Sequence, residues 1–461
     1  DYRAIFRAYL ADPDLADARA RWPFVCMWDN HEFSWQGWQT LEDYGDGVKP
    51  AQTRKVAAAQ AWFEYQPARV KKADTDWNSF TAPKVNDTPV TAFDENGLGQ
   101  EPNNLAAIHA LTLYRSLRYG GNVDLIITDN RSYRSQDPTD APEAEALGDK
   151  NFPGLVPQDA IEILDAGRTY NGGKPPLTMH FAGKDIPNWR KNKPPPSILG
   201  AVQKQWFLQQ LRDSRATWKL WGNSVGSLDA RVDVENLPHD AAAKWPSEGY
   251  ATLTGGDWCL YRSERGEILD FVRAQAITGF ASLAGDRHAF FAGLLSKDLP
   301  PRTYEPVGVE FVTGSISAPG FAEAMEYKLP KDHPMRALYV QQSANGDVWR
   351  AINLTTRHGV RSSLSLAKTG DEKAALAQSN PDVAPHLSFV DWGGHGYTAI
   401  RASSDALEAE FVCVPRPIAR SSTGDGGPLA YRVRHAAKLW RAGEAPKLEQ
   451  TVIEGTPPLS T

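Results

Sequence analysis

Two chemically reactive side chains, Asp286 and His288, stand two positions apart directly after a predicted strand at 279–284. Side chains two apart on a strand point to the same face of a sheet, so this spacing directs a carboxylate and an imidazole to one side. Divalent and trivalent cations favour these ligand types. The pair therefore predicts a metal site, and an exposed turn that binds nothing is the alternative.

A second polar group, Asp29, Asn30, His31 and Glu32, follows an apolar run at 22–28 that predicts a buried strand. Several of these groups can bind metal, and histidine can transfer a proton near neutral pH. The alternative is structural: Asp29 or Asn30 caps a helix whose first turn contains Glu32. Polar residues just past a buried strand are, however, where such sheets keep their chemistry.

A third group comes after the predicted strand at 123–128, where Asp129 precedes Arg131, Tyr133 and Arg134. Guanidinium groups bind the oxygens of a phosphoryl group with fixed geometry. The alternative is an ion pair between Asp129 and Arg131 that serves structure alone. We assign Arg131 to phosphoryl binding and Arg134 to structure.

Composition and other motifs exclude several function classes. The net charge of −6 and the pI near 6.0 provide no basic field for a nucleic acid. No apolar run approaches the roughly 18 residues of a membrane span, and the three cysteines lack zinc-ribbon spacing. No glycine-rich phosphate loop is present, and the segment 222–226 fits the G-x-S-x-G letters without the partners of a serine hydrolase.

Helices and strands alternate through the middle of the chain, which predicts an α/β fold. Beyond about residue 305 we expect strands, at 307–316, 337–340 and 348–354, and no further long helix until about 429. Earlier in the chain, the periodicity predicts two short helices broken at Pro13, and the other expected helices are 52–66, 199–213 and 264–275.

Taken in order, these segments resemble the PhoD-like phosphatases, relatives of the calcineurin-like and purple acid metallophosphoesterases. The W-D-D-H-E motif of that family stands here at 28–32, with Asn30 in its third position, and the G-D-x-H motif stands at 285–288. The segment 128–134 is similar to L-D-T-R-x-Y-R and differs at two positions. Further segments echo the family at 199–208, 214–219, 257–265, 310–316 and 391–397.

The resemblance implies a four-layer αββα sandwich of the metallophosphoesterase type, β-rich toward the C-terminus. It implies a catalytic domain over 1–428, with insertions near 69–105 and 137–196, followed by a C-terminal helix and tail at 429–461. Two family segments that supply a Cys, an Asp and a Tyr to the metal cluster lie upstream of this sequence. We therefore expect a longer protein, or a separate chain that supplies the missing segment.

For the site, the resemblance implies hydrolysis of a phosphate monoester or diester by a metal-activated hydroxide, with iron plus calcium as the cluster. In the related G-N-H-E motif the Asn binds metal and the His assists the leaving group, which assigns these roles to Asn30 and His31. Arg131 would hold a phosphoryl oxygen. The expected metal ligands are Asp29, Asn30, Asp286 and His288.

Relatives of this kind are commonly exported, which implies a secreted or periplasmic protein that acts on a small phosphate ester. The rival hypothesis is a non-catalytic module that has lost part of its ligand set. Such a module would bind a phosphate ester or a glycan through aromatic loops that contain Trp35 and Trp38.

Overall fold

The computed structural model describes residues 2–45, 47–72, 76, 78–253, 255–342, 348–416 and 428–458. By its internal contacts the chain divides into two compact units. Unit 1 comprises Asp1–Ser116, Ile126–Gln136 and Pro196–Phe207. Unit 2 comprises Leu117–Leu125, Asp137–Pro195 and Leu208–Thr461.

The N-terminal part of unit 1 is helical, as the sequence predicts. Helix α2 begins at Pro13, and the Asp12 carboxylate caps it by accepting from the N–H groups of Asp14 and Leu15, at 3.0 Å each. Helix α3 places Val56 and Trp62 in the core of the unit. The helices that lie wholly in unit 1 are α1 Tyr2–Leu10, α2 Pro13–Arg21, α3 Gln52–Tyr65 and α4 Pro102–Ile108.

The predicted strand at 22–28 is wrong, because this segment, all of which the structure describes, contains no strand. Trp22 is 62% exposed and Val25 is 42% exposed, so the apolar run is not buried on both faces. A side chain rather than a neighbouring strand holds its backbone, since Arg115 Nη2 donates to the carbonyl of Cys26 at 2.6 Å. Pro23 also removes one backbone donor from the run.

The largest sheet has seven strands in the order β18-β14-β15-β13-β10-β6-β5. Strands β10, β13 and β15 run parallel, whereas β14 runs antiparallel to β15 and β18, so the sheet is mixed. The prediction of strands near 123–128 and 279–284 is confirmed. The strands are β5 Arg115–Tyr119, β6 Val123–Ile127, β10 Trp218–Val225, β13 Phe280–Gly285, β14 Phe290–Leu295, β15 Gly308–Val312 and β18 Leu387–Asp391.

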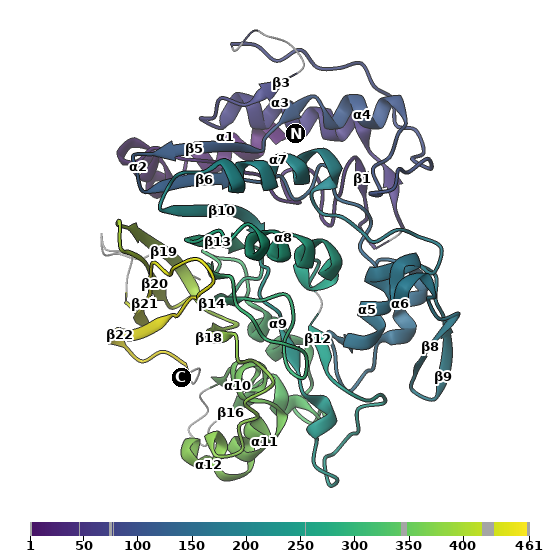
Figure 1. Ribbon diagram of the computed structural model, residues 1–461, viewed down its shortest axis with the longest axis vertical. Coiled ribbons are helices and arrows are strands. Elements are labelled where there is room, and N and C mark those ends of the chain that lie inside the picture. The colour runs from purple at the N-terminus through teal and green to yellow at the C-terminus, as the bar shows by residue number, and fades with distance from the viewer. Residues whose placement is uncertain are drawn as a thin grey trace. The chain divides into compact units, whose positions relative to one another are not determined.

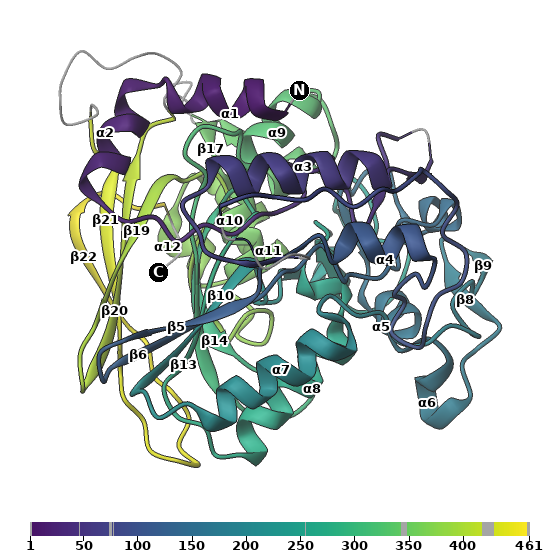
Figure 2. The same ribbon diagram turned by 90° about the horizontal axis from the view of Figure 1, so that it is seen from above.

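A second, antiparallel sheet of four strands lies alongside β13 and β14 in unit 2 (Figures 1 and 2). The core of unit 2 lies between the two sheets, where Phe290 and Phe311 of the large sheet meet Phe411 of the second. Alternate residues of β20 are buried, which is the pattern of a strand with one face on the core. The four strands are β19 His395–Ala402, β20 Ala406–Val414, β21 Tyr431–Lys438 and β22 Glu449–Gly455.

The expected C-terminal helix after residue 429 is wrong, because β21 and β22 belong to this second sheet. Tyr431, Val433 and His435 alternate with exposed or half-buried residues, so the period of the segment is that of a strand. Tyr431 and Val433 fall two apart, which favours a strand over the helix expected there.

Between β15 and β18 in sequence, the expected strands at 337–340 and 348–354 are largely wrong. Residues 336–338 form a short 3₁₀ helix, and only Val348–Trp349 (β17) of the second segment is a strand. Most of the segment that follows is buried, and a short buried run does not distinguish helix from strand. The helices here are α9 Phe321–Lys328, α10 Ala351–His358, α11 Val360–Thr369 and α12 Glu372–Leu376, of which the last three gather together in Figure 1.

The remaining elements are two long helices and a number of short helices and strands. The two other helices expected by sequence are α7 Gly200–Asp213 and α8 Arg262–Ala274. The excursion at 137–196 contains β7 Leu155–Pro157, α5 Gln158–Ala166, α6 Tyr170–Gly173, β8 Thr178–Phe181 and β9 Lys184–Pro187. The small strands elsewhere are β1 Leu41–Glu42, β2 Lys49–Pro50, β3 Lys71–Lys72, β4 Leu111–Thr112, β11 Arg231–Val232, β12 Ala251–Leu253 and β16 Gln341–Gln342. Among the described residues, no helix has the length and apolar character that crossing a bilayer requires.

Candidate functional site

In unit 1, the predicted site residues Asp29, Asn30 and His31 lie in a turn. The Asn30 carbonyl accepts from the N–H groups of Phe33 and Ser34, at 3.0 and 2.8 Å. The capping alternative is wrong, because no helix begins in this described segment. Glu32 instead closes the turn by accepting from the Asp29 N–H at 2.8 Å, and burial raises the pKa of the Glu32 carboxyl.

Asp29 forms an ion pair with Arg131, whose Nε donates to Asp29 Oδ1 at 2.7 Å. The side chain of Arg131 is 6% exposed and that of Asp29 is 27% exposed, so little water screens the pair. The expected partner of Arg131, Asp129, accepts instead from the backbone N–H groups of Arg131 and Ser132, at 3.0 and 2.9 Å. Asp129 thus shapes the loop that holds Arg131, and Arg131 neutralises Asp29.

Asn30 is buried and completes this cluster. With its amide oriented so that Nδ2 faces Asp29, it donates to Asp29 Oδ2 at 3.1 Å and accepts from the Gln36 N–H at 3.1 Å. Both carboxylate oxygens of Asp29 therefore have protein partners. His31 is exposed, and its ring stacks on Trp35 with centroids 6.4 Å apart.

Lys55 is a residue of this region that the sequence analysis missed. Its Nζ lies 3.9 Å from the centre of the Trp28 ring and 3.3 Å from Ser132 Oγ, and the side chain is fully buried. Burial lowers the pKa of the Lys55 ammonium to about 8. The signal was present, since Lys55 occupies the helical stripe that Gln52, Val56 and Ala59 bury on α3.

In unit 2, Asp286 and His288 lie just past β13, in a turn where both have left-handed backbone (φ 65° and 51°). The strand has already ended at Gly285, so strand alternation does not direct these two side chains as predicted. They nevertheless line one cavity of about 220 Å³, which we call the turn cavity. Left-handed backbone in non-glycine residues is rare and clusters at functional sites.

The imidazole of His288 has a fixed orientation. Its Nδ1 lies 2.8 Å from the carbonyl oxygen of Pro319, which can only accept, so Nδ1 carries the proton. In the neutral ring, Nε2 then presents a lone pair. Metal-binding histidines are typically held in this way, by a carbonyl or carboxylate on the other ring nitrogen.

A buried ion pair supports the same turn. Arg287 Nε donates to Asp257 Oδ2 at 2.7 Å, and Asp257 Oδ1 accepts from the Cys259 N–H at 2.8 Å. The Asp257 carboxylate raises the pKa of Arg287 against the opposing effect of burial. A side chain at Gly226 would collide with this guanidinium, since its Cβ would lie 2.6 Å from Arg287 Nε.

The G-x-S-x-G letters at 222–226 therefore have a structural explanation. Ser224 lies within strand β10 rather than on the strand-to-helix turn that exposes a nucleophilic serine. Gly226 gives Arg287 its room. The serine-hydrolase alternative has no geometric basis in this segment.

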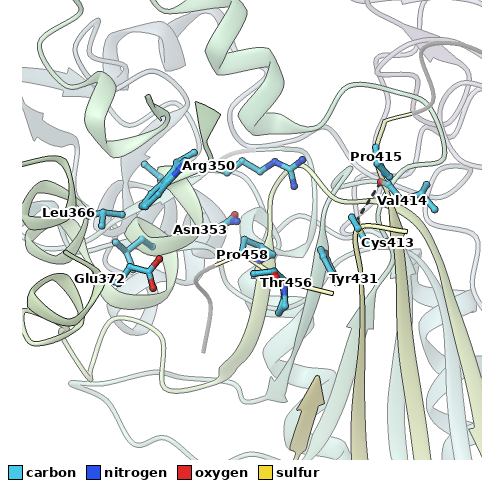
Figure 3. A pocket seen from close by; sticks show the side chains of 15 residues that line it. Arg350, Asn353, Leu366, Glu372, Cys413, Val414, Pro415, Tyr431, Thr456 and Pro458 are labelled. Atoms are coloured by element: carbon cyan, nitrogen blue, oxygen red, sulfur yellow. Dashed lines mark hydrogen bonds between the residues drawn. The ribbon is translucent and has the colours of Figure 1, made fainter. Parts of the chain in front are cut away.

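A larger cavity of about 400 Å³ lies elsewhere in unit 2, between helices α10–α12 and strands β20 and β21 (Figure 3). The described residues that line it include none of the predicted site residues. Its guanidinium, Arg350, is bound to Asp391 at 2.8 Å, and Tyr431 donates to the same carboxylate at 2.7 Å. The segment at 391–397, which resembles the family, thus contributes a buried carboxylate, Asp391, that holds two neighbouring side chains in place.

The predicted ligands are of the right chemical kind for a metal cluster but do not form one within either unit. Unit 1 supplies a carboxylate and an amide, and unit 2 supplies a carboxylate and an imidazole with a free Nε2. Among the described residues, no group of three or more His, Cys, Asp and Glu side chains is arranged to hold an ion. Each pair fits a hard cation in donor type, and neither pair is a complete site.

Comparisons with known proteins agree on one family. The family model of the PhoD-like phosphatases matches residues 1–411. Alkaline phosphatase D of Bacillus subtilis (strain 168) is 23% identical over 322 residues, which covers 69% of this chain and 40% of that protein. The solved structure of PhoD has the same fold, with a TM-score of 0.54 and 17% identity over 98% of this chain and 59% of that one. The chain thus spans less than two thirds of the length of either relative.

Proposed function

We propose, because the chain belongs to the family of PhoD-like phosphatases, that it hydrolyses phosphate esters. The observation that carries the proposal is the family match over residues 1–411, which includes both polar segments of the candidate site. The distant relationship to alkaline phosphatase D, a hydrolase, supports the same activity class.

We propose that the cofactor is a metal cluster, with iron plus calcium as its composition. Its ligands would be Asp29, Asn30, Asp286 and His288. When bound, such a cluster supplies Lewis acidity and activates water at neutral pH. The orientation of His288 supports this assignment, because the Pro319 carbonyl that accepts from Nδ1 already sets the tautomer of the ring.

The remaining proposed roles belong to His31 and Arg131. His31 is exposed, and an imidazole can act as a general acid near neutral pH. In this role it would donate a proton to the alkoxide leaving group of the ester. Arg131 is proposed to hold a phosphoryl oxygen, because the planar fork of a guanidinium binds tetrahedral oxyanions with fixed geometry, and its Nε donates to Asp29. Asp29 keeps that fork in place.

We also propose the finer features that the family implies for the whole protein. These are a four-layer αββα arrangement and insertions near 69–105 and 137–196, of which the second shapes the substrate pocket; the catalytic domain extends past residue 428, because β21 and β22 complete the second sheet. Export to the periplasm or outside the cell belongs to the same set. We further propose that another segment, on the same chain or on a separate chain, supplies the remaining metal ligands.

The rival proposal is a non-catalytic module that binds a phosphate ester or a glycan. The observation that favours it is that the described residues contain no complete metal-ligand group. Metal analysis decides between the two, together with hydrolysis of a chromogenic phosphodiester by the natural full-length protein. The catalytic proposal predicts bound cation, turnover, and loss of both in Asp286→Ala. Absence of both bound cation and turnover in the full-length protein would establish the rival, whereas turnover that is unchanged in Asp286→Ala would remove Asp286 from the proposed site.

A further inference from the structure

The turn cavity has both polar and apolar lining residues, all within unit 2. Its polar side chains are Asp257, Asp286, Arg287 and His288. The apolar side comprises Leu253, Phe321 and Trp392, of which Leu253 and Trp392 are almost fully buried. A ligand whose phosphate lies at Asp286 and His288 therefore extends its organic group against apolar side chains.

The apolar wall is rigid. The Trp392 ring packs edge-to-face on Phe291, with centroids 4.9 Å apart, and lies 5.2 Å from the Phe321 ring. Trp392 Nε1 donates to Thr356 Oγ1 at 3.0 Å, which fixes the rotation of the indole. Such a preformed wall binds a flat apolar group without a large entropic cost of ordering side chains.

Hydrogen-bonding side chains are scarce on this wall. The indole N–H of Trp392 already has its partner in Thr356, and Leu253, Phe321 and Ala324 have no polar side-chain atoms. The hydroxyl groups of a sugar or of glycerol would lose water here without replacement, at a cost of roughly 1–3 kcal/mol each. The wall therefore disfavours polyhydroxyl groups.

The charges of the turn cavity also disfavour a second anionic group on the ligand. Among the described residues that line it, Arg287 is the one Lys or Arg side chain. Its charge is compensated by the ion pair with Asp257, and its Nη2 donates to the Leu228 carbonyl; its Nη1 has no hydrogen-bond partner among the described residues but is buried away from solvent. A nucleoside diphosphate or a bisphosphate would find no available cation.

The volume sets the size of the group. An apolar cavity of roughly 150 Å³ accommodates a benzene ring. The turn cavity measures about 220 Å³ and therefore holds one six-membered ring with room for a linking carbon.

From these observations we propose that the turn cavity binds the organic group of the substrate, and that this group is an uncharged apolar one of about the size of a benzyl group. The proposal rests on the proposed function, because it places the phosphate of an ester at Asp286 and His288. It narrows the substrate class from phosphate esters in general to aryl and arylalkyl esters.

The test compares benzylphosphonate with methylphosphonate as inhibitors of chromogenic phosphoester hydrolysis by the full chain. The two have the same anionic group and differ only in the apolar group. We expect benzylphosphonate to bind at least about tenfold more tightly, because the ring leaves water. Isothermal calorimetry of both phosphonates provides a readout that does not need turnover.

Two variants locate the effect. Ala324→Phe fills the turn cavity, and Phe321→Ala removes part of its wall; each should reduce the benzyl-to-methyl affinity ratio to within about twofold of one. Glu326→Phe is the matched control, because it places the same new side chain on α9 at an exposed position. It should leave the ratio at its original value.

The outcomes separate this inference from the proposed function. If the chromogenic esters are hydrolysed and the two phosphonates bind equally, the inference is wrong and the proposed function stands. If nothing is hydrolysed, the proposed function fails, and calorimetry still decides the preference of the cavity. Tighter binding of glycerol phosphate than of benzylphosphonate would overturn the inference as well.

Discussion

Asp29 and Asn30 are fixed by side-chain partners, whereas Asp286 and His288 are fixed by the backbone of a left-handed turn. In the first segment, Arg131 and Asn30 occupy the oxygens of Asp29, and the cluster is part of the packing of unit 1. In the second, a carbonyl orients His288 and leaves Nε2 available on the turn cavity. Substitutions at the unit 2 segment should therefore lower activity with little loss of stability. Substitutions at the unit 1 segment should lower activity and stability together.

The largest expected effect is in unit 2. Asp286→Asn keeps the left-handed backbone, which Asn tolerates well, and removes the carboxylate charge. Hydrolysis should fall by about 1000-fold or more, because a metal ligand is weakened, while the melting temperature stays within about 2 °C. Steady-state kinetics and calorimetric melting measure the two effects.

Asp286→Ala provides the control for the backbone. It should lose the same activity and in addition about 1–2 kcal/mol of stability, because Ala pays a steric cost at φ 65°. If Asp286→Asn kept its activity, the turn would serve structure only, and the difference between the two segments would disappear.

The second effect is in unit 1, where we expect activity and stability to fall together. Arg131→Ala leaves Asp29 without its ion-pair partner and removes the proposed phosphoryl contact. We expect roughly 100-fold lower kcat/KM and about 2 kcal/mol lower free energy of unfolding in urea. Arg131→Lys keeps the positive charge but lacks the planar guanidinium. Relative to Arg131→Ala, it should therefore restore more of the stability than of the activity.

A loss of stability in Arg131→Ala with unchanged kinetics would contradict the functional role of this residue. Arg131 would then serve structure alone, as the ion-pair partner of Asp29. The sequence analysis gave a structural ion pair as the alternative for Arg131, with Asp129 as the partner.

The third effect is a pH dependence that the buried Lys55 gives to unit 1. Its pKa in the folded chain is about 8, and an unfolded lysine titrates near roughly 10.4. Between these values the unfolded chain binds the additional proton, so stability should increase as the pH rises from 8 to 10.4, by about 2–3 kcal/mol. Below pH 8 both states carry the proton, and this contribution no longer varies.

Lys55→Met should remove that part of the pH dependence, which urea unfolding at a series of pH values would show as a flatter profile. Lys368→Met, at an exposed position of α11, is the matched control and should retain the slope of the parent. An equal slope in the parent and in Lys55→Met would mean that Lys55 is not buried as described.

Much of the framework was accessible from sequence, because long periodic segments carry their own signal. The predicted helices at 52–66, 199–213 and 264–275 and the strands near 123–128 and 279–284 are all present within a few residues. The prediction that Asp286 and His288 directly follow a strand is confirmed, since β13 ends at Gly285. The apolar run at 22–28 was misinterpreted because hydrophobicity does not reveal whether a neighbouring strand exists.

The site itself depends on contacts that no local pattern encodes. The partner of Arg131 is Asp29, 102 positions away, whereas the nearer Asp129 binds backbone N–H groups. The left-handed backbone at 286 and 288 is equally invisible, since neither residue is a glycine. Lys55 is the exception: a lysine on the apolar stripe of a helix is a signal that a reader of the sequence can use.

The smallest expected effect tests whether backbone contacts hold the turn in unit 2. Gly320 precedes α9, and a Cβ there would lie 2.6 Å from the Trp392 carbonyl oxygen and 3.1 Å from that of His288. Because these atoms belong to the backbone, Gly320→Ala must shift the chain, which should cost about 1–2 kcal/mol of stability. The same shift displaces the wall of the turn cavity, so KM should rise more than kcat falls. Gly121→Ala, at a glycine with open space around it, should stay within about 0.5–1 kcal/mol of the parent. If Gly320→Ala were equally neutral, the turn would not depend on this close approach, and side-chain contacts would have to hold it as they hold Asp29.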